Sequence, residues 1–244
     1  QSILQNYNGY SKTDKTKNFI KEHSVKGIIV PHGTYMQSGQ SMAYGHKLVG
    51  LLPKDREWKI LIIGPSHGIP FSGAAVTKDS SWKMPLGDVR AKDLREEIGV
   101  DKNDEDIFIN APEVHREEHS IEVQIPFLQV ALDGKFVIYP LITGSCRPDI
   151  LAEKILDFAK KDDSLIVISS NFINGRDNEK TMKDIEKLNI DSVIETADAS
   201  GRTGVLTMMF IAEKLGLKPD YLCYQNASDS LTGDTGYGSL AFFK

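Results

Sequence analysis

The sequence has few cysteines and no long apolar run. Its two cysteines, Cys146 and Cys223, match no metal or redox spacing. The sequence alone does not decide whether they form a disulfide. No apolar stretch approaches the ~18–20 residues of a membrane-spanning helix. The polar start of the chain does not have the pattern of a signal peptide either. We therefore expect no membrane contact and, as the simplest interpretation, a cytoplasmic location.

An excess of positive charge is missing as well. The net charge of -5 offers no basic face for a phosphate backbone, which argues against nucleic acid as a partner. The 244 residues suffice for one large α/β domain, which we place at residues 26–244 after a polar segment at residues 1–25. Because the chain begins with Gln1 and not Met, the sequence allows for an initial segment before it. No feature indicates an oligomeric state.

Two apolar runs end in histidines. Residues 60–63 are Ile-Leu-Ile-Ile, stopped by Gly-Pro, which is typical of a strand buried on both faces of a parallel sheet. Residues 27–30 form a similar run. In open α/β sheets, ligands bind beyond the carboxyl ends of the strands, where His67 and His32 follow these runs. Neutral imidazole is the commonest protein ligand for metals, so these histidines are candidates for a metal-binding or catalytic role. The alternative is that both rings only form hydrogen bonds to the loop backbone.

Strand and helix patterns alternate along the rest of the chain. Pro126 lies inside one predicted helix and should kink or restart it. The alternation predicts a three-layer α/β sandwich around a central, mostly parallel or mixed sheet. Beyond the two strands above, the expected strands are residues 136–142, 164–169 and 237–243. The expected helices are residues 39–52, 92–98, 118–132, 148–160, 178–189 and 204–215, with an acidic turn at 101–106.

The other four histidines give weaker signals. His23 and His46 lie beside lysines, and we expect both on solvated helix surfaces. His115 and His119 stand four apart, the spacing of a zinc-binding helix, but the glutamates are out of place for an HExxH motif. If this segment is helical, His119 points into the cleft. The alternative is a run of surface charge.

Several stretches resemble the Memo family, which includes the eukaryotic Memo protein and the prokaryotic AmmeMemoRadiSam system protein B. Residues 28–39 (IIVPHGTYMQSG) resemble the family's PHAGY…SG stretch, and residues 64–67 match its GPSH. Residues 118–128 (EHSIEVQIPFL) are nearly its EHSLEVQLPFL. Weaker matches follow the same order at residues 82–87, 136–144, 169–172 and 232–237.

The resemblance implies a fold similar to class III extradiol dioxygenases, which bind non-haem iron. His32 and His67 match the two histidines that ligate iron or copper in Memo proteins, so a metal, iron or else copper or zinc, is expected there. His119 matches a histidine lining the same pocket and is the expected catalytic proton donor or acceptor. The implied function is a non-haem metal-dependent redox or dioxygenase-like enzyme.

The sequence also departs from the family pattern. The family's aspartate in SSDF is Asn171 here, its following histidine falls on Asn174, and its cysteine ligand aligns near Ser230. With fewer charged or soft donors, we expect the metal site to be partly eroded and the metal to be weakly bound or absent. The alternative is a non-catalytic module that binds a small molecule or a peptide in the same cleft. The expected substrate contacts are Tyr35, Ser66, Asn171, Asn174 and Ser230.

Overall fold

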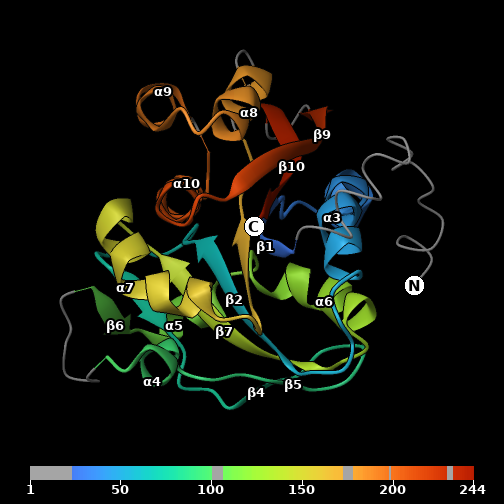
Figure 1. Cartoon of the computed structure of the whole chain (residues 1–244), viewed down its shortest axis with the longest axis vertical. Helices are drawn as coiled ribbons and strands as arrows, with labels where there is room; N and C mark the ends of the chain where they lie inside the picture. Colours follow the sequence, from blue (N-terminus) through green and yellow to red (C-terminus); the bar gives the residue numbers. More distant parts are fainter. Residues whose placement is uncertain (1–23, 101–106, 173–177, 198, 230–232) are drawn as a thin grey trace.

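The chain folds around an eight-stranded sheet with helices on both faces (Figure 1). The computed structural model describes residues 24–100, 107–172, 178–197, 199–229 and 233–244. The strand order is β6-β3-β7-β2-β8-β1-β10-β9. The strands of this sheet are β1 (Val25–Val30), β2 (Trp58–Pro65), β3 (Ala74–Val76), β6 (Phe108–Asn110), β7 (Phe136–Thr143), β8 (Ser164–Ser169), β9 (Lys218–Asp229) and β10 (Gly233–Phe243). A separate pair is formed by β4 (Ser81–Trp82) and β5 (Val89–Arg90).

The centre of the sheet is parallel and its flanks are not. The four strands β7, β2, β8 and β1 run parallel, whereas β10 pairs antiparallel with both β1 and β9. On the other flank, β3 is antiparallel to β7 and parallel to β6. The sheet is therefore mixed, as the sequence predicted. All residues of β1 and β8 are buried, which agrees with their unbroken apolar character.

Helices cover both faces, which confirms the predicted three layers. Figure 1 shows α3 (Tyr35–Val49) and α6 (Ile125–Ala131) on one side of the sheet, with α7 (Pro148–Lys160) and α10 (Arg202–Leu215) on the other. Among the described residues, no helix has the length and apolarity to cross a membrane. The remaining helices are α4 (Leu94–Ile98), α5 (Pro112–Arg116), the 3-10 helix η1 (Glu122–Gln124), α8 (Asn178–Glu186) and α9 (Ile190–Thr196).

Some helix boundaries differ from those expected. The first helix begins at Tyr35, one turn earlier than predicted. The expected helix at 118–132 is a 3-10 turn followed by α6, which starts just before Pro126. The prediction that this proline restarts the helix is confirmed, because a proline in the first turn needs no N–H partner. The acidic turn expected at 101–106 lies outside the described residues.

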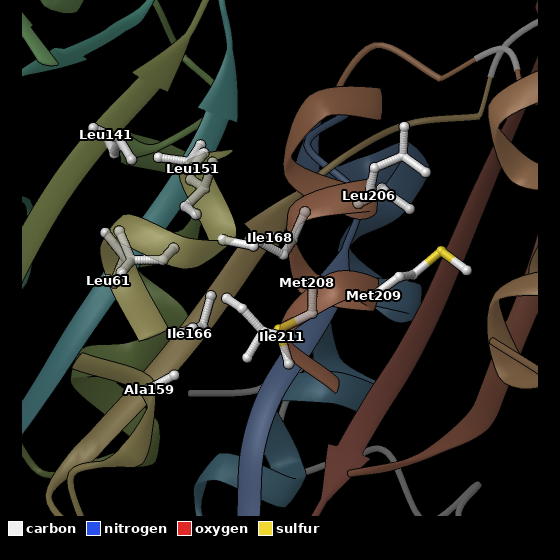
Figure 2. Packing of buried hydrophobic residues seen from close by; sticks show 14 of the residues in the cluster. Leu61, Leu141, Leu151, Ala159, Ile166, Ile168, Leu206, Met208, Met209 and Ile211 are labelled. Carbon is white, nitrogen blue, oxygen red and sulfur yellow. The ribbon is translucent and has the colours of Figure 1, made fainter. Parts of the chain in front are cut away.

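Side chains alternate between two core layers along β8. Figure 2 shows Ile166 and Ile168 on the same side as Met208 and Ile211 of α10, and all four are buried. The intervening β8 residues face the opposite layer, which α3 and α6 cover. Burying each such side chain contributes roughly 1.5–3 kcal/mol. Both layers pack against β8, and its last residue, Ser169, lies within the cluster described next.

Candidate functional site

Three histidine rings meet at the carboxyl edge of the sheet. His32 follows β1 and His67 follows β2, with β8 between these two strands. His119 comes from the turn between α5 and η1. The ring centres of His32 and His67 are 5.0 Å apart, those of His67 and His119 are 5.0 Å apart, and those of His32 and His119 are 5.7 Å apart. The structure thus brings the three histidines together.

Hydrogen bonds fix the tautomer of His32. Its Nδ1 lies 3.0 Å from the hydroxyl of Ser169, which itself donates to the carbonyl of Ser120 at 2.7 Å. The Ser169 oxygen is therefore the acceptor, and Nδ1 carries the proton. The Nε2 atom accepts from Ser200 Oγ at 3.1 Å. Burial, reinforced by the two neighbouring imidazoles, lowers the pKa of His32 to about 3, so this ring is neutral.

A buried carboxylate orients His67. Both oxygens of Glu118 lie 3.0 Å from His67 Nδ1, and the carboxylate also accepts the backbone N–H groups of His67 and Ser120 at 2.8 Å each. Burial acts to raise the pKa of Glu118, but these hydrogen bonds outweigh it and hold the pKa at about 2. Because a carboxylate only accepts, His67 carries its proton on Nδ1 and turns the Nε2 lone pair to other partners.

Two histidines and a carboxylate form a group that could hold a metal ion, and His32 is not part of that group. Donor atoms of His67, Glu118 and His119 all lie within 4.8 Å of one another. A histidine that ligates a metal donates its second N–H to a fixed acceptor, and both His32 and His67 do so. Two imidazole nitrogens on one ion lie at most about 4.2 Å apart, since each is about 2.1 Å from the metal, so rings that share an ion are close neighbours. Imidazole and carboxylate donors suit iron, copper and zinc alike.

Asn171 holds the loop that carries His32. Its Oδ1 accepts the backbone N–H of His32 at 2.8 Å, and its own backbone N–H donates to Ser200 Oγ at 3.2 Å. The Ser200 hydroxyl therefore joins the Asn171 backbone to the His32 ring. A neutral amide can make these contacts without adding charge to the cluster.

The other expected substrate contacts lie on different segments. Tyr35 begins α3, and its hydroxyl donates to the carbonyl of Val123 at 3.2 Å. Ser66 precedes His67 and lines a cavity of about 290 Å³. Outside the described residues lie the last two of this set, Asn174 and Ser230.

The prediction that His46 is solvated is wrong. This side chain is fully buried in α3, its Nδ1 lies 2.9 Å from the carbonyl of Met42, and its ring lies 5.0 Å from that of Phe127. Burial lowers the pKa of His46 to about 4. The flanking lysine misled the prediction, because adjacent helix residues point about 100° apart. His23, which shared this prediction, lies outside the described residues.

His115 and His119 do not share a helix face. The helix that carries His115 ends at Arg116, and His119 lies in the turn beyond it. His115 is buried, its Nε2 lies 3.0 Å from the carbonyl of Ala75, and its ring stands edge-on to Trp82. His119 is the exposed partner, with 53% of its side chain accessible. The two histidines therefore lie in different environments.

Sequence reasoning did not assign several residues that support the cluster. Glu118 adjoins His119, and a carboxylate next to a candidate histidine was a usable signal. Gln124 donates to the carbonyl of Pro31 at 2.9 Å and to Ser169 Oγ at 3.0 Å, joining the two strand ends. Ser200 lies between α9 and α10 with no motif around it, so the sequence held no signal for it.

Comparisons with known proteins find related sequences and a similar fold. The family model described as Memo-like protein matches residues 3–239. A MEMO1 family protein of Sulfolobus acidocaldarius is 31% identical over 272 residues, covering 99% of this chain and 90% of the relative. One from Sulfurisphaera tokodaii is 35% identical over 238 residues, covering 88% and 82%. The crystal structure of the uncharacterized protein JW3007 from Escherichia coli K12 shares the fold, with a TM-score of 0.54, 12% identity and coverage of 88% and 98%.

Proposed function

This chain belongs to the Memo family, and we propose that it binds a divalent transition metal at the histidine cluster and acts on a small molecule in redox or dioxygenase-like chemistry. His32 and His67 are the proposed ligands, each through Nε2; at His32 the ion would take the place of the Ser200 hydroxyl, which lies 3.1 Å from that nitrogen. The observation that carries the proposal is their matched tautomer, since Ser169 and Glu118 hold both Nδ1 protons away from the shared space. Iron is the expected metal, with copper or zinc as alternatives.

The surrounding residues would position the substrate and exchange protons with it. A bound ion would supply Lewis-acid or redox chemistry at the cluster. His119 is the proposed catalytic acid or base: its Nδ1 lies 3.5 Å from Glu118 Oε1, which leaves its Nε2 to take or give a proton. Its half-exposed ring can meet a ligand that enters from solvent. The proposed substrate contacts remain Tyr35, Ser66, Asn171, Asn174 and Ser230.

Metal analysis tests this proposal. Untagged protein is incubated with ferrous iron, copper or zinc under conditions that keep the ion soluble and is then desalted. Its metal content is measured by elemental mass spectrometry. We expect close to one ion per chain, and a loss of most of it in His32→Ala and His67→Ala. Wild-type protein that keeps less than about a tenth of an equivalent of every metal would contradict the proposal.

A binding module without catalysis is the second candidate function. It is favoured by Asn171, whose neutral amide is used to hold the backbone of His32 and adds no negative charge to the cluster. In that case the cleft would recognise a small molecule or a peptide and would need no ion. Unchanged ligand binding after removal of all metal would favour this candidate.

A further inference from the structure

A cavity of about 290 Å³ adjoins the histidine cluster. Its lining includes Ser66 just after β2, Thr143 at the end of β7, Ser200 just before α10 and Arg202 at the start of α10. The hydroxyl of Ser200 also bonds His32 Nε2 at 3.1 Å. The cavity and the cluster therefore share a wall, and a ligand in the cavity would lie next to the imidazoles.

The lining of this cavity combines hydrogen-bond donors with an apolar wall. Arg202 and Thr203 belong to the first turn of α10, and among the described residues no acidic side chain lines the cavity. The opposite wall is apolar and is formed by Pro65, Ile69 and Phe71, among others. A volume near the lower end of the usual range for ligand pockets suits a small molecule.

In the part of the chain that the structure describes, two positive features at the start of α10 have no negative partner. This 14-residue helix has no acidic residue in its first turn, and its cap, Gly201, has no side chain to accept the first N–H groups. The Arg202 guanidinium donates to the carbonyl of Ile194, and within the described residues it forms no ion pair. By contrast, carboxylates pair with Arg56, Arg90, Arg95 and Arg147.

We propose that this cavity binds the acidic group of a small organic anion. Arg202 and the first turn of α10 would hold the carboxylate or phosphate, and the apolar wall would contact the body of the molecule. The other end would reach the histidine cluster past Ser66 and Ser200. The inference names the ligand class of the site proposed above, and only the role of that far end rests on the metal proposal.

Calorimetric titration of metal-free protein with benzoate tests the inference, with benzamide as the uncharged match and inorganic phosphate as a second anion. We expect benzoate to bind at least about tenfold more tightly than benzamide, and Arg202→Gln to remove that difference. Arg56→Gln, which removes an exposed arginine remote from the cavity, should change the affinity less than about twofold. Arg202→Lys, which keeps the charge, should retain part of the binding.

Equal binding of benzoate and benzamide, or unchanged benzoate affinity in Arg202→Gln, would overturn the inference. So would the absence of binding by either anion up to about 50 mM. Thermal unfolding of each variant shows whether Arg202→Gln remains folded; if it does not, Thr203→Val gives the second comparison. Metal content is measured in parallel. The metal proposal expects His67→Ala to lose metal and to keep benzoate binding. The anion proposal expects Arg202→Gln to lose benzoate binding and to keep metal. Each proposal can therefore fail without the other.

Discussion

Glu118 holds two of the three histidines of the cluster in place. One carboxylate, 1% exposed, accepts the ring and the backbone N–H of His67 together with the backbone N–H of Ser120. A buried charge is tolerated only when such donors surround it, and removing the charge leaves those donors without their acceptor. The same side chain therefore holds the turn that carries His119 and the loop that carries His67.

Glu118→Gln should weaken metal binding about 10- to 100-fold, the usual effect of losing a group that orients a ligand. A neutral amide has one acceptor oxygen, so it cannot serve the ring of His67 and both backbone N–H groups. Titration with zinc, followed by calorimetry, measures the change. Glu117→Gln alters an exposed neighbour and serves as the control. Equal zinc affinity in the two variants would contradict the role given to Glu118.

Gly64 lies where a strand end meets this turn. A Cβ at residue 64 would come within 2.3 Å of Ser120 Oγ, and Ser120 is fully buried. We expect Gly64→Ala to lower the free energy of unfolding by about 1–3 kcal/mol, as overpacking does, and to displace the turn. Urea denaturation gives the value. Adding Ser120→Ala removes the clashing oxygen and should recover part of the loss.

Gly68→Ala is the matched control, because an added Cβ there would meet nothing within 4 Å. Its free energy of unfolding should change by less than about 0.5 kcal/mol. If Gly64→Ala were equally mild, the close approach of β2 to the turn would be looser than the contact distance implies.

At the residue scale, the sequence singled out the histidines but not the groups that orient them. His32 and His67 follow apolar strands, and this position is visible as a pattern of neighbours. The partners of His32, Ser169 and Ser200, are 137 and 168 residues away along the chain. Contacts of this kind arise from the strand order, which periodicity does not encode.

At the element scale, strongly patterned segments were predictable. β8 matches its predicted bounds, and so does α7, where a proline in the first turn and an apolar stripe mark the helix. β9 was missed. It is an edge strand with Pro219 near its start and many polar residues, so neither an alternating pattern nor an apolar run announces it. Its pairing with β10 defines it.

The packing of α10 on β8 supports a prediction at this scale. Ile168 is fully buried between the central strands and this helix (Figure 2). Ile168→Ala should lower the free energy of unfolding by about 2–5 kcal/mol, since it leaves a cavity in a close-packed layer. Ile194→Ala, at a side chain that is 41% exposed, should cost less than about 1 kcal/mol. Similar losses in both variants would contradict this account of the core.

At the scale of the whole molecule, groups with shifted pKa values lie at both ends of the central strands. Neutral His32 and the carboxylate of Glu118 lie at the carboxyl edge, and an ionic group lies nearer the amino ends of the strands. There Lys59 and Lys161 pair with Glu97, which also accepts from Tyr139. Burial acts to raise the pKa of Glu97, but these donors outweigh it and lower the pKa to about 2. Acid should therefore weaken the molecule in two separate pH ranges.

The upper range belongs to the buried histidines. His46 has a pKa of about 4 when folded and 6.5 ordinarily, so below pH 6.5 the unfolded chain binds a proton that the folded chain refuses. The free energy of unfolding then falls as the pH drops from 6.5 towards 4, by about 3 kcal/mol for this residue. The lowered pKa values of His32 and His115 act in the same direction. Glu97 contributes only below about pH 4.5, because its stabilisation is complete above the unfolded value.

His46→Gln isolates one part of this dependence. The variant is less stable at every pH if the new amide packs poorly, so the informative quantity is the change in the free energy of unfolding between about pH 7.5 and pH 5, measured by urea denaturation. That change should be smaller in the variant by about 2 kcal/mol, because a glutamine takes up no proton in either state. An identical pH dependence in both proteins would mean that His46 is protonated in the folded chain. The burial of its ring against Phe127 would then be incomplete in solution.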